Sequence, residues 1–234
     1  MGYAPRLNTS IDALCTFFHV TLITQNLTLL FMHPILANNN AFAVREKVGI
    51  FKAANSYDFF HPETGELLMQ STEEDLGLFT KLLRFTDFKT FTPFDATVRD
   101  TAGRRVIRVS RGISFLFSRV EVFDENDMPV GAFQERFSFP RKKIEVLDND
   151  GDIMLMLRGS FFAWDFTFFR MTSGGEEEVA RIGKVWAGLA KELFTTADNY
   201  VLGMSPVLNE QNPLRMMILA AVVCVDMVFK ERSA

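Results

Sequence analysis

The sequence contains few of the side chains that build most reactive or metal-bound sites. It has two cysteines, Cys15 and Cys224, which excludes a disulfide framework and favours a reducing, cytoplasmic compartment. Its three histidines are His19, His33 and His61, and we expect none of them to form a site in the core. No Ser-His-Asp arrangement, HExxH motif, CxxC pair, phosphate-binding loop or GxGxxG turn can be recognised. We therefore predict a protein that is not an enzyme.

A strong excess of charge of one sign is also lacking. The 25 basic and 29 acidic residues leave a net charge of -4, whereas a dedicated nucleic-acid-binding domain is usually strongly basic. We therefore expect no nucleic acid partner. What the sequence does have is 48% hydrophobic residues, enough for a sizeable core, and 25 phenylalanines, which suit half-buried strands better than a helical bundle.

Residues 1–31 differ from the rest of the chain. The stretch 11–31 is apolar but is interrupted by acidic, amide and hydroxyl side chains, and only Arg6 is basic. A secretory signal has a basic start and an unbroken apolar region. Because regular patterning begins near Met32, we predict that residues 1–31 are an extension outside the fold or a non-native upstream start. Residues 32–234 are then a single domain; a membrane anchor or targeting segment is the alternative for the first stretch.

An apolar strand, a polar turn and a second apolar strand recur through the middle of the chain. The turns begin at Asp100, Asp124 and Asp148, which are spaced by 24 residues, and Thr172 takes the next position. Asp, Asn and Gly enter tight turns because they accept backbone hydrogen bonds or tolerate positive φ. We therefore predict four successive hairpins and an earlier one around residues 62–65.

The strands of these hairpins are expected to form a closed sheet. Apolar and polar residues alternate in 106–110 and 120–123, which points one face of each strand inward and the other to water. A long meander must hide its edge strands, and closure into a barrel does so. A propeller is disfavoured because a 24-residue period supplies too few strands for a blade. The sequence thus predicts a mainly β, antiparallel barrel.

The last segment changes period and predicts a helix. Asn212 and Pro213 supply an N-cap and a first-turn proline, and 214–229 is nearly all apolar apart from Arg215 and Asp226. About 16 residues span about 24 Å, which is short for a hydrocarbon core of about 30 Å. Because a wide barrel needs an apolar filling, we predict that the helix lies inside the barrel rather than across a membrane. Asp226 is then expected at the barrel mouth or paired with a basic residue.

Two polar segments are candidate binding sites. The run 148–152 resembles the opening of an EF-hand loop, but Gly159 stands where the closing glutamate is needed, so a solvated turn is the preferred interpretation. The second candidate is a set of basic residues that we predict to contact anionic phospholipid head groups at about 1 kcal/mol per charge, with an ordinary wet surface as the alternative. These residues are Arg104, Arg105, Arg108, Arg141, Lys142 and Lys143.

Part of the sequence is similar to the phospholipid scramblases and to bacterial scramblase-related proteins. The specific elements are Trp186-Ala-Gly188 and the run from Ala197 to Tyr200, and the likeness covers about residues 32–231. The segments that carry it are 44–51, 78–84, 181–200 and 220–231. The resemblance implies the tubby-like fold, shared with the tubby and LURP-one-related proteins, in which about twelve strands surround a hydrophobic C-terminal helix.

The resemblance also implies a calcium segment. Asp198 and Asn199 match it, whereas Thr196 replaces its first aspartate and 204–207 contain no carboxylate. Too few oxygen ligands remain for a tight calcium site, so we expect no cofactor. We predict a non-enzymatic tubby-like binding module, cytoplasmic and peripheral at the membrane, whose partner is anionic phospholipid or a small apolar ligand. Phospholipid scrambling and an uncharacterised enzymatic activity are the alternatives.

Overall fold

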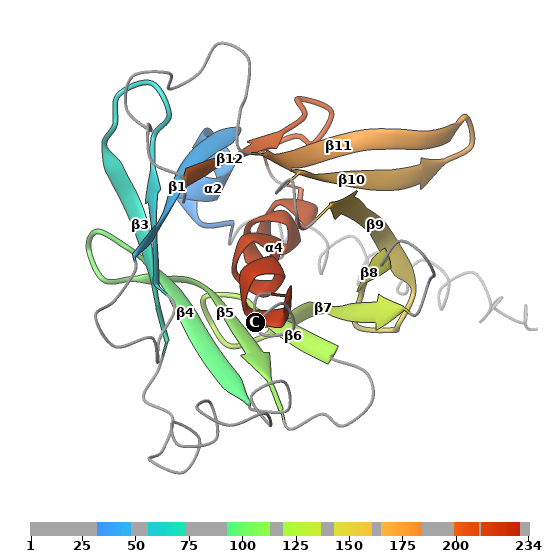
Figure 1. Cartoon of the computed structure of the whole chain (residues 1–234), viewed down its shortest axis with the longest axis horizontal. Helices are drawn as coiled ribbons and strands as arrows, with labels where there is room; N and C mark the ends of the chain where they lie inside the picture. The colour runs from blue at the N-terminus through green and yellow to red at the C-terminus, as the bar shows by residue number, and fades with distance from the viewer. Residues whose placement is uncertain are drawn as a thin grey trace, which may run out of the picture. The chain divides into compact units, whose positions relative to one another are not determined.

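The fold is a ring of twelve strands with one long helix. A computed structural model describes residues 32–47, 56–73, 93–112, 119–136, 143–160, 165–183, 199–210 and 212–229. His33–Ala234 is one compact unit, whereas the predicted extension, residues 1–31, lies outside the described residues. The elements are α2 (Pro34–Asn38), β1 (Ala41–Lys47), β2 (Ser56–Phe60), β3 (Leu67–Glu73), β4 (Phe94–Asp100), β5 (Arg105–Arg111), β6 (Arg119–Phe123), β7 (Pro129–Arg136), β8 (Lys143–Leu147), β9 (Ile153–Ser160), β10 (Asp165–Thr172), β11 (Gly175–Gly183), β12 (Asn199–Met204) and α4 (Leu214–Phe229) (Figure 1).

Each strand pairs antiparallel with its sequence neighbours, and β1 pairs with β12 to close the barrel. In the closing pair Phe42 lies opposite Leu202 and Val44 opposite Tyr200. Closure leaves none of the twelve described strands at an open sheet edge that could pair with another chain. The mainly β, antiparallel, twelve-stranded barrel predicted from the turn spacing and the family resemblance is therefore confirmed.

The predicted hairpin turns are present, and aspartate side chains organise three of them. Asp124 Oδ1 accepts hydrogen bonds from the backbone N–H groups of Asn126 and Met128, at 2.8 and 2.9 Å. Asp148 Oδ1 accepts from Asp150 N and Asp152 N, at 3.0 and 2.8 Å. The EF-hand-like run is thus a hairpin turn between β8 and β9, as preferred above.

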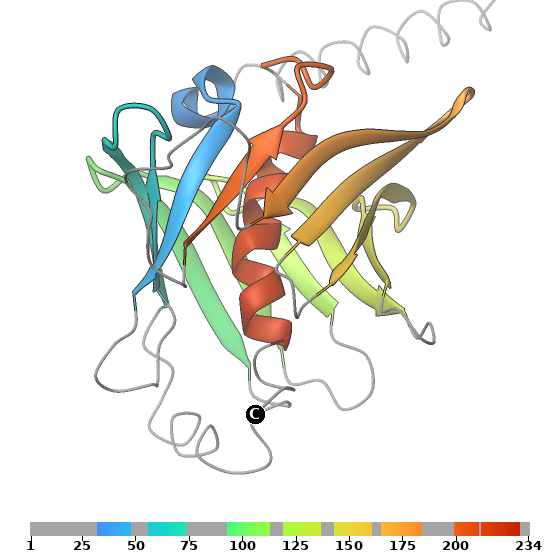
Figure 2. The ribbon, with the colours of Figure 1, turned by 45° about the horizontal axis from the view of Figure 1, so that its top comes forward.

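The two ends of the barrel differ. All five hairpin turns lie at one end, together with α2 and the connection from β12 to α4, and we call this the hairpin end (Figure 2). At the opposite end, which we call the loop end, the strands are joined by segments outside the described residues. Because strands alternate in direction, the end on which a residue lies follows from its place in its strand.

The helix α4 starts at the hairpin end and runs through the middle of the barrel (Figures 1 and 2). Asn212 Oδ1 accepts a hydrogen bond from Leu214 N at 3.0 Å, which confirms the predicted N-cap. Every side chain from Leu214 to Val225 is buried, and the helix packs against β5, β6, β7 and β12. The predicted helix bounds and its place inside the barrel are confirmed. None of the helices that the structure describes is long and apolar enough to cross a bilayer.

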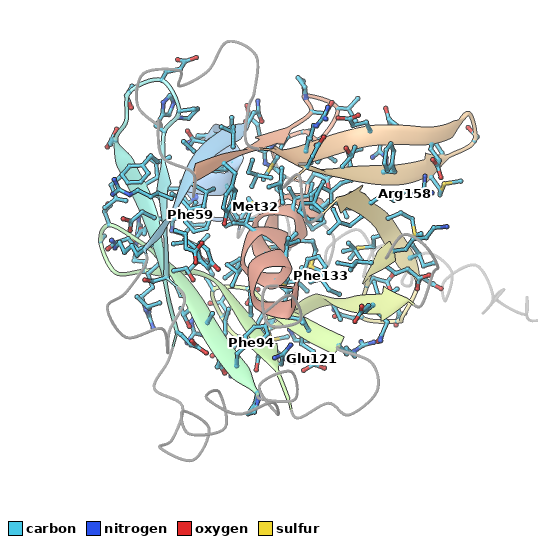
Figure 3. All side chains as sticks on the ribbon, in the orientation of Figure 1. Met32, Phe59, Phe94, Glu121, Phe133 and Arg158 are labelled. Atoms are coloured by element: carbon cyan, nitrogen blue, oxygen red, sulfur yellow. The ribbon has the colours of Figure 1, made fainter. Side chains whose placement is uncertain are left out.

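The barrel wall supplies aromatic side chains to the space around α4. Phe59, Phe94 and Phe133 lie on the inner side of the wall, whereas Glu121 and Arg158 lie on the outer side (Figure 3). The interior also holds the fully buried aromatic side chains of Phe42, Tyr57, Phe166 and Phe168. The described interior is therefore filled, and a small apolar ligand inside the barrel would have to displace these groups.

Candidate functional site

Three of the basic residues predicted to contact lipid lie together near the hairpin end, and each is paired with an aspartate. Arg104 follows β4 in the first of the 24-residue-spaced turns, and Arg105 and Arg108 lie on β5. The pairs are Arg104 Nε with Asp100 Oδ2 at 2.7 Å, Arg105 Nη1 with Asp127 Oδ2 at 2.5 Å, and Arg108 Nε with Asp95 Oδ1 at 2.8 Å.

These pairings leave little cationic character for an external anion. The hydrogen bonds that Arg108 donates to Asp95 raise the pKa of Arg108, and the hydrogen bond from Arg105 lowers the pKa of Asp127. Arg108 also stacks on the ring of Phe123, with 5.2 Å from its guanidinium carbon to the ring centroid. A phosphate would have to compete with carboxylates already in place.

The remaining predicted basic residues lie elsewhere. Lys143 begins β8 and therefore lies at the loop end, so the structure does not bring it together with the three arginines. Arg141 and Lys142 lie outside the described residues. That any of these six residues contacts lipid remains a prediction.

Two cations at the loop end lack the partners that the hairpin-end arginines have. Among the described side chains, neither Arg119, exposed at the start of β6, nor Lys143 has a hydrogen bond or ion pair. The register places both on the outer face, because Arg119 and Glu145 each lie opposite Gln134 and Lys143 is two residues before Glu145 on the same strand. We call Arg119 and Lys143 the loop-end cations. Sequence reasoning missed Arg119, because pairing is decided by strand register and not by local charge.

The hairpin end is acidic. Its turns carry many carboxylates and few cations beyond the arginines already paired. The acidic side chains in these turns and in the connection to α4 are Glu63, Glu66, Asp124, Glu125, Asp127, Asp148, Asp150, Asp152 and Glu210. The charge of the described barrel is therefore asymmetric, and an anionic surface is repelled by the hairpin end.

The degenerate calcium segment is only partly visible. Asp198 lies outside the described residues, and Asn199 opens β12 without a described side chain. Within the ranges that the structure describes, no three His, Cys, Asp or Glu side chains converge in a way that suits a metal ion. Asp198 and Asn199 therefore stay a prediction as metal ligands.

A buried histidine at the hairpin end was not expected from the sequence. His33 caps α2: its Nδ1 accepts a hydrogen bond from Ile35 N at 3.3 Å. Its Nε2 lies 3.4 Å from Asp100 Oδ2, close enough for attraction but without hydrogen-bond geometry. His33 is 4% exposed, so it lies in the buried part of the fold. The following Pro34, at the first helical position, was the signal that could have marked a capped helix.

Burial sets the protonation preference of His33. The largest effect is the loss of solvation, which lowers the pKa of His33. The carboxylates of Asp100 and Glu125 raise this pKa, whereas the positive charge of Arg104 lowers it further. Burial alone would raise the pKa of Asp100, but hydrogen bonds from the backbone and side chain of Arg104 outweigh it and hold that pKa low. Neutral His33 beside ionised Asp100 is therefore the stable arrangement near neutral pH.

The lowered pKa of His33 predicts a loss of stability in mild acid. Below an ordinary histidine pKa of about 6.5 the unfolded chain binds a proton that the folded chain resists, so the free energy of unfolding falls as the pH drops from about 7.5 to about 5.5. His33→Asn keeps a capping oxygen but cannot titrate, so it is expected to flatten this slope in urea titrations at the two pH values. Thr72→Asn, at an exposed position of β3, is the control and is expected to keep the slope. An unchanged slope in His33→Asn contradicts the assignment.

A buried arginine fixes α2 to the core helix. Arg215, in the first turn of α4, is 0% exposed, and burial lowers its pKa. It donates four hydrogen bonds: Nε to Leu36 O at 2.8 Å, Nη1 to Asn40 Oδ1 at 2.9 Å and Leu208 O at 3.1 Å, and Nη2 to Asn39 O at 2.6 Å. All four acceptors are carbonyl or amide oxygens. Arg215 thereby ties α2 and the β12–α4 connection into one cap over the hairpin end.

A closed antiparallel barrel of twelve strands around a C-terminal helix is the tubby-like architecture that the resemblance implied. A family model described as Scramblase matches residues 20–232, and the chain belongs to this family.

Known proteins that are similar to the chain include a human scramblase and a plant protein of known structure. Phospholipid scramblase 2 of Homo sapiens is 24% identical over 152 residues, which are 60% of this chain and 50% of the human protein. The chain thus spans about half the length of that relative. An X-ray structure of a protein from Arabidopsis thaliana is similar with a TM-score of 0.47 at 13% identity, covering 87% of this chain and 98% of that one.

Proposed function

We propose that the protein is a non-enzymatic, cytoplasmic module that binds the surface of anionic phospholipid membranes reversibly through its loop end. The observation that carries the proposal is the charge asymmetry of the barrel. Arg119 and Lys143 have no hydrogen bond or ion pair among the described side chains, although Lys143 lies near enough to Glu176 to lower the pKa of that carboxyl, whereas the hairpin end is acidic. Membership of the scramblase family supports a lipid partner.

The buried helix shapes the mode of binding. Because α4 fills the barrel, its insertion into a bilayer would empty the core. Binding at the membrane surface therefore costs less free energy than insertion of α4. Basic side chains contribute about 1 kcal/mol each near an anionic surface, so the loop-end cations together contribute about 2 kcal/mol. Such a contribution favours weak, salt-sensitive and reversible attachment.

Co-sedimentation with vesicles tests the proposal. The protein is expected to pellet with phosphatidylcholine vesicles that contain about 30% phosphatidylserine, and to stay in solution with phosphatidylcholine alone or at high salt. The double variant Arg119→Gln and Lys143→Gln is expected to lower the partition coefficient about 30-fold, since it removes the about 2 kcal/mol that the two charges contribute.

Two variants make the result specific. Asn126→Asp with Ser173→Asp changes the net charge by the same amount at exposed turns of the hairpin end, and it is expected to leave the partition coefficient nearly unchanged. If the double variant Arg105→Gln and Arg108→Gln lowers the partition coefficient more than the loop-end variant does, the paired arginines contact the lipid and the loop-end assignment is contradicted. Equal pelleting with neutral and anionic vesicles would exclude electrostatic lipid recognition.

Lipid translocation is the second candidate, favoured by the match to a human protein named as a phospholipid scramblase. Proteoliposomes with a fluorescent lipid and an external quencher distinguish the two functions. A surface-binding module leaves the quenched fraction at about the outer-leaflet half, with or without calcium. Quenching beyond that fraction would favour translocation over the proposal.

A further inference from the structure

The large apolar side chains that are exposed in the described part of the chain all lie at the hairpin end. Met128 is 61% exposed, Ile153 53%, Met171 62% and Val207 49%. Met128 belongs to the β6–β7 turn, and Ile153 follows the β8–β9 turn. A hydrogen bond of 2.8 Å from Asn149 Nδ2 to Pro129 O joins these two turns, so their apolar side chains belong to neighbouring parts of one surface.

Both turns are held rigid by contacts of their own. In the first, Asp124 fixes the backbone of Met128, and Asp127, at a φ of 61°, is bound by Arg105 and Arg108 of β5. In the second, the Asp148 carboxylate binds two backbone N–H groups, as described above. Rigid turns present apolar groups without a further loss of chain entropy on binding.

The same turns carry carboxylates with no cation of their own. Glu125, Asp150 and Asp152 have no ion pair or side-chain hydrogen bond among the described residues. We define the tip surface as Met128, Ile153, Glu125, Asp150 and Asp152. It combines exposed apolar groups with unneutralised negative charge.

We propose that the tip surface binds a basic amphipathic segment of a partner protein. Lysine or arginine side chains of such a segment meet the free carboxylates, while its apolar side chains cover Met128 and Ile153; methionine adapts its shape to different apolar partners. An anionic membrane is repelled by these carboxylates, and a two-fold contact with a second copy would place like charges opposite each other. The inference stands independently of lipid binding, which uses the opposite end.

The proposal is tested by fluorescence anisotropy with the full chain and a labelled synthetic helical peptide of leucine and lysine with one apolar face. A peptide with glutamate in place of lysine is the charge control and is expected not to bind. Met128→Gln with Ile153→Gln is expected to weaken binding of the lysine peptide about tenfold or more. Asp150→Asn with Asp152→Asn is expected to weaken it and to reduce its salt dependence.

Met171→Gln is the matched control, since it removes an equally exposed methionine from the β10–β11 hairpin, and it is expected to leave affinity unchanged. Wild-type affinity in the Met128→Gln, Ile153→Gln variant, or equal binding of the glutamate peptide, would overturn the proposal. A concentration-dependent dimer abolished by that variant would identify a second copy as the occupant instead. Reduced pelleting of that variant with anionic vesicles would identify a membrane as the occupant. Either the dimer or the reduced pelleting would overturn the proposal of a partner protein.

Discussion

Replacing Arg215 with alanine is expected to destabilise the protein by about 3–5 kcal/mol. The guanidinium is completely buried and donates to the carbonyl oxygens of Leu36, Asn39 and Leu208, which lose their donor in the variant. Alanine favours a helix, so helix propensity does not explain a loss of this size. Burying an arginine is itself costly, but four satisfied hydrogen bonds offset that cost, and their removal also leaves a cavity.

Urea unfolding monitored by circular dichroism measures the effect, with Arg119→Gln as the control. Arg119 is exposed and has no partner among the described side chains, so its replacement is expected to change the free energy of unfolding by about 0.5 kcal/mol or less. Arg215→Met, which keeps much of the side-chain volume, separates lost packing from lost hydrogen bonds. If both Arg215 variants unfold like the wild type, α2 is not held by this contact.

Replacing Ala221 with arginine is expected to unfold most of the molecules or to cost several kcal/mol. Ala221 is 0% exposed in the middle of α4, where the barrel wall surrounds the helix. An arginine there adds volume to a filled core and buries a cation without a partner. The effect reports directly on whether the barrel and the helix form one core.

The matched control is Thr72→Arg, which introduces the same side chain at an exposed position of β3. It is expected to alter the midpoint of thermal unfolding by only a few degrees. If Ala221→Arg melts cooperatively near the wild-type temperature while keeping its β-sheet spectrum, the helix is not part of the core. Such a result would favour the alternative in which α4 serves a membrane.

Much of the fold is predictable because its signals are local. The aspartates at 100, 124 and 148 accept hydrogen bonds from the residues that follow them, so each turn is encoded by its own few residues. Asn212 and Pro213 likewise fix the start of α4. Barrel closure followed from the need to hide strand edges and from the family resemblance.

The charged contacts are harder to predict because register and closure decide them. Arg108 meets Asp95 from the neighbouring strand and Asp127 from a turn, and neither pairing follows from distance along the chain. Arg215 binds oxygens of residues 36, 39 and 40, which lie at and after α2. No residue near Arg215 in the sequence predicts this contact. The three arginines grouped as a lipid-binding candidate are therefore engaged with aspartates. The loop-end cations became visible only once pairings were known.

The central claim, that α4 is the core of a closed barrel, is tested most directly by the reactivity of Cys224. This thiol is 3% exposed, and burial raises its pKa well above the ordinary value. In a Cys15→Ser variant without detergent, Cys224 is expected to react with a water-soluble disulfide reagent at least about 1000-fold more slowly than a small-molecule thiol, and only as fast as the protein opens. Reaction at the rate of the free thiol, in a protein that keeps its β-sheet spectrum, would contradict the claim.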